Sequence, residues 1–73
     1  MGPDAIEVEK KYPILRYFRY AHLPPKLQAF SKPFADLAYI VATTLPDGPE
    51  LAAGLRKLIE AKDCAVRAAL DLP

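Results

Sequence analysis

The sequence predicts an all-α fold, an antiparallel two-helix hairpin with an extended N-terminal arm that assembles into a homo-oligomer. Two segments of roughly twenty residues carry apolar residues at spacings of three and four, the period of a helix packed on one face. Only the stretch LPDGP separates them, and so short a connection places consecutive helices antiparallel. The chain has 73 residues with one Cys and one His, so neither an internal disulfide nor a closed zinc site can supplement a small core. Association between copies is the remaining source of stability.

Residues 1–11 are mainly polar and precede the helical part of the chain. Ile6 and Val8 are apolar and alternate with acidic residues. We expect a flexible arm here, extended or disordered. Residues 12–73 are expected to form a single helical hairpin domain, with helices at about 24–45 and 48–71.

Residues 12–22 combine aromatic and basic side chains. Four of the seven aromatic residues lie here, among them Tyr17 and Tyr20, and they are interleaved with Arg16, Arg19 and His22. In one interpretation the rings cover the open end of the helical pair. In the other, rings and guanidinium groups form a nucleotide pocket, because a base needs a flat face and a phosphate needs a fork of donors.

The first long helix, at about 24–45, begins with two prolines that suit a first helical turn. Its apolar residues at helical spacing are Leu27, Phe30, Phe34, Leu37, Val41 and Leu45. Pro33 lacks the N–H that a continuous helix would donate to the Ala29 carbonyl. We expect a continuous helix bent at Pro33, and the alternative is a later start capped by Ser31.

The second long helix, at about 48–71, has a start marked by Asp47 and Glu50. Their spacing is that of a capping box, in which each carboxylate accepts a hydrogen bond from the other residue's backbone N–H. Its apolar seam comprises Leu51, Leu55, Leu58, Ala65, Ala69 and Leu72. Lys62 interrupts that seam, so its charge must reach water, pair with an acid or meet a ligand.

Other polar residues of this helix indicate a solvated face. Arg56 and Glu60, and then Asp63 and Arg67, are four apart and are predicted to pair. If an oligomer repeats these arginines around its axis, they would form a basic pocket in a nearly neutral protein. Cys64 lies among Ala61, Ala65 and Val66, and we expect it to pack as a small hydrophobe.

The charge balance limits the possible partners. A net charge of +1 gives the molecule no overall field that would attract duplex DNA or an anionic membrane. No run is long enough to span a membrane and the N-terminus lacks a signal-peptide pattern, so we expect a cytoplasmic protein. There is no Gly-rich phosphate loop and no suggestive set of Ser, His and acid, so we expect no enzyme activity, cofactor or metal. A general base at His22 is the weaker alternative.

A further pattern covers most of the chain, from about Tyr17 to Leu70. It comprises Phe18, Tyr20, His22 and Pro24, then Phe34, Leu37 and Ala38, then Leu45, Pro46, Pro49 and Glu50, then Leu55, Leu58, Glu60, Ala61 and Val66. This order resembles the helical hairpin shared by phage anti-CBASS and anti-Thoeris sponge proteins. The resemblance implies a viral protein that binds the cyclic nucleotide signals of bacterial immune enzymes, does not cleave them, and acts in the bacterial host cytoplasm.

The resemblance also implies a homo-oligomer such as a hexamer. Its ligand would be a cyclic dinucleotide, a cyclic trinucleotide or a cyclic ADP-ribose variant, bound between subunits. The candidate ligand-binding residues are basic or aromatic: Arg16, Tyr17, Arg19, Tyr20, His22, Lys26, Arg56, Lys62 and Arg67. The alternative is a non-enzymatic structural or protein-binding hairpin whose spare apolar face takes a partner helix.

Overall fold

The computed structural model describes residues 5–73. These residues form four helical segments, namely α1 (Ala5–Lys11), the 3-10 helix η1 (Pro13–Phe18), α2 (Pro25–Thr44) and α3 (Pro49–Ala69). Helix accounts for 78% of this described part, which contains no strand. The predicted all-α class is therefore confirmed.

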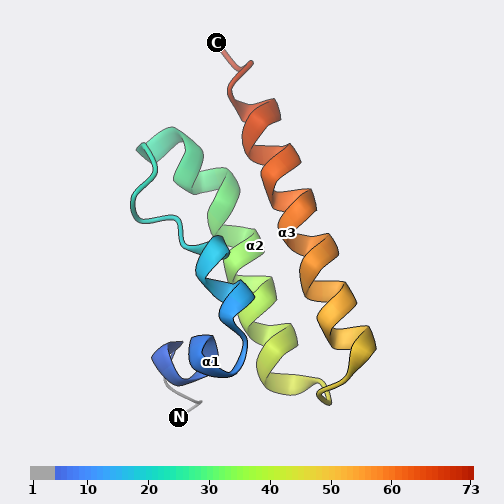
Figure 1. The fold of residues 1–73 in the computed structure, drawn as a ribbon. Helices are drawn as coiled ribbons and strands as arrows, with labels where there is room; N and C mark the ends of the chain where they lie inside the picture. Colours follow the sequence, from blue (N-terminus) through green and yellow to red (C-terminus); the bar gives the residue numbers. More distant parts are fainter. Residues whose placement is uncertain (1–4) are drawn as a thin grey trace.

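Helices α2 and α3 lie side by side and run in opposite directions (Figure 1). Each begins with a proline, Pro25 or Pro49, at a position whose N–H would have no partner within the helix. Their bounds agree within two residues with the predicted 24–45 and 48–71. Pro33 lies inside α2, so the predicted continuity of that helix is confirmed.

The start of α3 differs from the predicted capping box. Gly48 is the N-cap, with a φ of 156°, and no side chain donates or accepts a hydrogen bond at this cap. Glycine adopts such a φ without the strain that a Cβ atom would cause. Because Gly48 takes the cap position, Asp47 lies one residue too early to act as the N-cap. The prediction of a capping box formed by Asp47 and Glu50 is therefore wrong.

The hydrophobic core draws on every helical segment of the described chain. Its buried members are Val8, Leu15, Phe18, Ala38, Ala42, Leu51 and Leu55. Burial of Val8 attaches α1 to the other helices, because a helical turn presents this side chain to apolar partners on η1 and α2. The extended arm expected for residues 1–11 is thus wrong for Ala5–Lys11, and residues 1–4 of that prediction lie outside the described residues.

Helix α2 turns its small residues inward. Its buried side chains are Ser31, Ala38 and Ala42, and side chains this small allow the neighbouring segments to approach closely. Leu37 is 47% exposed and Ile40 is 55% exposed, so neither side chain is buried within the single chain. The large apolar side chains that are exposed on this helix and the turn after it are Phe30, Leu37, Ile40 and Leu45. The helical spacing that includes Phe30, Leu37 and Leu45 therefore does not mark buried positions in a single chain.

The sequence predictions for two side chains of α3, Lys62 and Cys64, had different outcomes. The Lys62 side chain is only 13% exposed, and its ammonium pairs with Asp63 at 2.9 Å, so a lysine stem does lie in the apolar seam. Cys64 is exposed, and its predicted packing is wrong. Two residues along a helix correspond to a rotation of about 200°, which carries Cys64 away from the face that holds Lys62.

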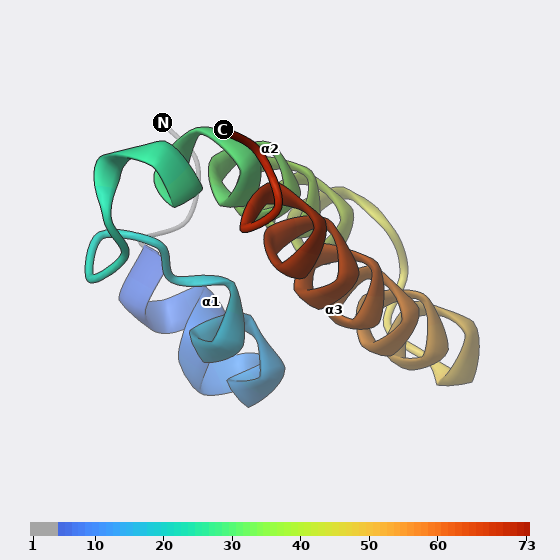
Figure 2. The same ribbon diagram turned by 90° about the horizontal axis from the view of Figure 1, so that it is seen from above.

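Segments α1 and η1 form a second layer on one face of the α2 and α3 pair (Figure 2). Segment η1 contacts α1, α2 and α3, whereas α1 contacts η1 and α2 and makes no contact with α3 within the described residues. Helix α1 therefore borders the edge of α2 that faces away from α3. Three surface cavities lined by residues of α1 lie along this border.

Candidate functional site

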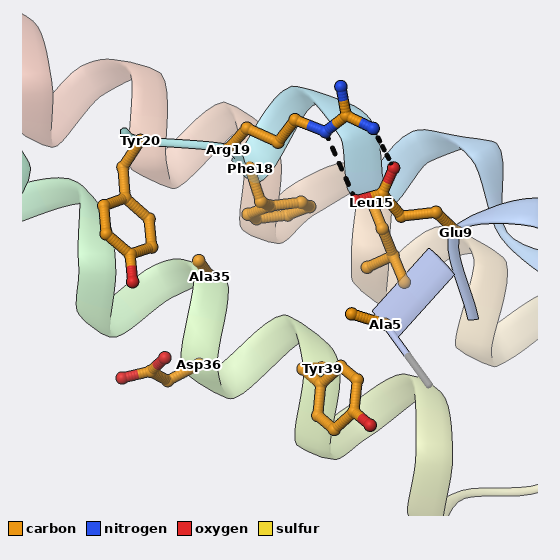
Figure 3. Close-up of a pocket in the computed structure, with 9 residues that line it drawn as sticks. All are labelled: Ala5, Glu9, Leu15, Phe18, Arg19, Tyr20, Ala35, Asp36 and Tyr39. Carbon is orange, nitrogen blue, oxygen red and sulfur yellow. Dashed lines mark hydrogen bonds and ion pairs between the residues drawn. The ribbon is translucent and has the colours of Figure 1, made fainter. Parts of the chain in front are cut away.

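A cavity of about 270 Å³ opens between α1, η1 and the middle of α2 (Figure 3). We name it the aromatic cavity. Its lining combines rings with charged groups, among them Phe18, Tyr20, Tyr39, Glu9, Arg19 and Asp36. The Phe18 ring is buried and forms part of the core, so this wall of the cavity is fixed by the fold. Tyr20 lies two residues after the end of η1 and stands over α2, opposite the Tyr39 end of the cavity (Figure 3).

An ion pair between Arg19 and Glu9 borders this cavity. Arg19 Nε donates to Glu9 Oε2 at 3.3 Å, and Nη2 of the same guanidinium donates to Oε1, so two donors meet two acceptors. The hydrogen bond from Arg19 to Glu9 and the charge of that carboxylate raise the pKa of Arg19. The two side chains are 63% and 23% exposed, respectively, and pairs in contact with water add little to stability. Arg19 can therefore exchange this partner at low cost.

A second cavity of about 300 Å³ adjoins the first and shares Glu9 and Arg19 with it. Lys10 and Arg16 also line it, so three cationic groups face one carboxylate. We name it the cationic cavity. Arg16 Nε donates to the Pro13 carbonyl at 3.2 Å, which ties this guanidinium to the start of η1. The Arg19 and Glu9 pair thus forms the boundary between an aromatic space and a positively charged one.

Asp36 supplies a carboxylate to the aromatic cavity. It pairs with Lys32, one turn earlier on α2, through an Nζ to Oδ2 contact of 2.6 Å. The hydrogen bond to Asp36 and the charge of its carboxylate raise the pKa of Lys32, with a smaller contribution from Tyr20. The Tyr20 hydroxyl points toward the part of α2 that carries Asp36 (Figure 3). An aromatic ring and an acceptor group therefore lie at the same end of the cavity.

The structure brings together three of the residues predicted from the sequence. Arg19 lines both cavities, Tyr20 lines the aromatic cavity and Arg16 lines the cationic cavity. Tyr17 belongs to the same segment but is 65% exposed, and His22 lies in the exposed turn that leads to α2. The clustering of rings and guanidinium groups in residues 12–22 thus marks one side of the site.

The remaining predicted residues lie elsewhere in the chain. Lys26, at the start of α2, donates to the Leu72 carbonyl at 2.8 Å. Arg56, Lys62 and Arg67 lie on α3, and α3 does not line either cavity. The pair predicted between Asp63 and Arg67 is replaced by other contacts. Asp63 binds the adjacent Lys62, and Arg67 donates to Cys64 Sγ at 3.4 Å.

Four polar or charged residues that line the two cavities were not predicted from the sequence: Glu9, Lys10, Asp36 and Tyr39. Glu9 lies ten residues before Arg19, and no local pattern links the two. Asp36 and Tyr39 are three residues apart on α2, a spacing that places them on one face of the helix and could have indicated a shared surface.

Comparisons with models of protein families, with curated proteins and with solved structures found no match. Among the described residues, no helix combines the length and the apolar character needed to cross a membrane. The arrangement around Arg19 is therefore the basis for a functional proposal.

Proposed function

We propose that the protein binds a cyclic oligonucleotide signal and holds it without cleaving it. The observation that carries this proposal is the position of Arg19 between an aromatic cavity and a cationic cavity. A nucleotide has two parts that match them, because bases stack on aromatic rings and phosphate oxygens bind guanidinium and ammonium groups. In the proposed complex a base occupies the aromatic cavity and its phosphodiester lies against Arg19 and Arg16.

The resemblance of residues 17–70 to sponge proteins supports a cyclic ligand and an oligomeric hairpin. In this arrangement several copies associate through the exposed apolar residues of α2, with an even-numbered closed assembly and a hexamer as the expected form. A neighbouring copy would then add Arg56, Lys62 or Arg67 of its α3 to the ligand. The proposed function in a cell is sequestration of an immune signal in the cytoplasm of an infected bacterium.

Calorimetry with the full chain tests binding directly. The ligands are cyclic di-AMP, cyclic di-GMP, cyclic tri-AMP and cyclic ADP-ribose, and a matched thermal shift series would reveal stabilisation of about 2.7 kcal/mol at a hundredfold excess over Kd. We expect at least one ligand to bind and to be recovered intact after heat denaturation. Arg19→Ala should lower the affinity for that ligand roughly tenfold or more, because the substitution removes a charge-assisted contact. Lys57→Ala, at an exposed position of α3, is the control and should leave affinity unchanged.

Absence of binding to every ligand at millimolar concentration would overturn the proposal. Recovery of a hydrolysed ligand would instead establish an enzyme. Unchanged affinity in both Arg16→Ala and Arg19→Ala would move the site away from these cavities and onto the long helices.

A structural or protein-binding hairpin is the second candidate function. The observation that favours it is the row of exposed apolar side chains on α2, which suits a partner helix as well as another copy. A chain that assembles normally and binds none of the four nucleotides would support this alternative.

A further inference from the structure

The aromatic cavity holds two carboxylates, and they differ in how far their oxygens are engaged. Glu9 accepts from Arg19 through both Oε1 and Oε2. Asp36 accepts from Lys32 through Oδ2 at 2.6 Å. An ionised carboxylate offers about four lone-pair positions and no donor, so Asp36 keeps acceptor capacity toward the cavity that it lines.

The surroundings of Asp36 favour a flat ring with N–H donors. Tyr20 and Tyr39 provide ring faces on the same cavity, and Ala35 leaves room beside them on α2. The Lys32 ammonium is already bound to this carboxylate. A negatively charged group would meet repulsion from Asp36, whereas the N–H edge of a base would meet an acceptor.

We propose that Asp36 is a specificity-determining residue that selects guanine over adenine for the base in the aromatic cavity, an inference that rests on the proposed function. The guanine edge offers two adjacent donors, N1–H and N2–H, which can bind one carboxylate together. The same edge of adenine places the acceptor N1 beside its amino group, and the lone pair of N1 is repelled by the carboxylate. Lys32 is a positioning residue in this arrangement, because its contact holds the Asp36 side chain in place.

The experiment compares the affinities of cyclic di-GMP and cyclic di-AMP for the full chain and for two variants. The native protein should bind cyclic di-GMP roughly tenfold or more tightly, the discrimination typical of a two-point contact to a base. Asp36→Asn keeps the size of the side chain but replaces one acceptor by a donor. It should abolish this preference, or invert it, because an amide suits the donor and acceptor pattern of adenine.

The ratio of the two affinities is the readout that a purely structural effect would not change. Lys32→Met is the matched control on the same helix face, and it should retain a preference for guanine with an affinity lowered for both ligands. Equal binding of the two ligands by the native chain, or an unchanged ratio in Asp36→Asn, would overturn the role of Asp36 and leave the proposed function intact. Failure of the native chain to bind either ligand would overturn this role, and failure across all four nucleotides of the earlier series would also remove the proposed function.

Discussion

The ammonium of Lys26, in the first turn of α2, donates a hydrogen bond of 2.8 Å to the backbone carbonyl of Leu72. This contact joins the start of one long helix to the segment that follows the other. It closes the end of the helical pair opposite the turn at Gly48 (Figure 1). The same contact occupies a lysine that the sequence indicated as a ligand residue.

Lys26→Met should loosen the end of α3 without unfolding the protein. The amides of Leu70, Asp71 and Leu72 bond to carbonyls of the preceding turn, and their hydrogen exchange should accelerate once the tail loses its anchor. Exchange measured by NMR checks this, with Lys57→Met as the control. Unchanged exchange at these three amides would show that Lys26 does not hold the tail, and lower ligand affinity would place Lys26 at the ligand.

Leu55→Ala should destabilise the protein by about 2 to 5 kcal/mol, the cost of deleting a buried leucine. Leu55 is 1% exposed and lies in the core between α3 and the small residues of α2. Leu58→Ala should cost less, because Leu58 is only partly buried. Urea unfolding at fixed protein concentration measures both changes. A larger loss for Leu58 than for Leu55 would contradict the packing described.

Replacement of Leu37 or Ile40 by Glu should dissociate the proposed assembly and preserve the helices. Both side chains are exposed on α2, so a charge there costs a single chain little but would be buried between copies. Light scattering reports the mass and circular dichroism reports the helix content, with Ala21→Glu in an exposed turn as the control. A native chain that is a folded monomer of 8.1 kDa would refute oligomerisation.

Lys62→Met should leave the melting temperature unchanged or raise it. The Lys62 side chain is 13% exposed, and an apolar side chain of similar length fills such a position without a charge to desolvate. The melting temperature without ligand and the affinity with ligand are measured together. Weaker binding in a folded variant would place Lys62 at a ligand bound between copies, whereas failure to assemble would indicate an ion pair across the interface.

Glu9→Gln should strengthen the binding of a phosphodiester ligand by up to about fivefold, the range expected for an exposed ion pair. Glu9 occupies the donors of Arg19 that the proposed ligand requires, so neutralising this carboxylate removes a competitor. Calorimetry with cyclic di-GMP measures the change, and Glu7→Gln on the same helix is the control. Equal or weaker binding would show that the ligand does not replace Glu9.

The long helices could be predicted because their signals are local. Pro25 and Pro49 mark the starts, and the apolar period continues through each helix. Helix α1 could not be predicted, since its stability depends on burial of Val8 against segments elsewhere in the chain. The face of α2 that packs inward could not be predicted either. Leu37 and Ala38 are neighbours in sequence, so either of them could have lain on the inner face.

The site could be predicted only on the side contributed by residues 12–22. Arg16, Arg19 and Tyr20 are close in sequence, so their composition alone suggested a shared surface. Asp36 and Tyr39 reach the same cavity from α2, and this proximity is created by packing of η1 on that helix. A single sequence carries no local signal for such a contact, and the pairing of Glu9 with Arg19 escaped prediction for the same reason.

The small buried residues and the large exposed residues of α2 have separate roles along one helix. Ser31, Ala38 and Ala42 are buried against neighbouring segments of the chain, while Leu37 and Ile40 are exposed to whatever lies outside it. Substitutions on the outer face leave the inner contact untouched. The partner that the outer face accepts can therefore be altered by substitution without disturbing the helical pair.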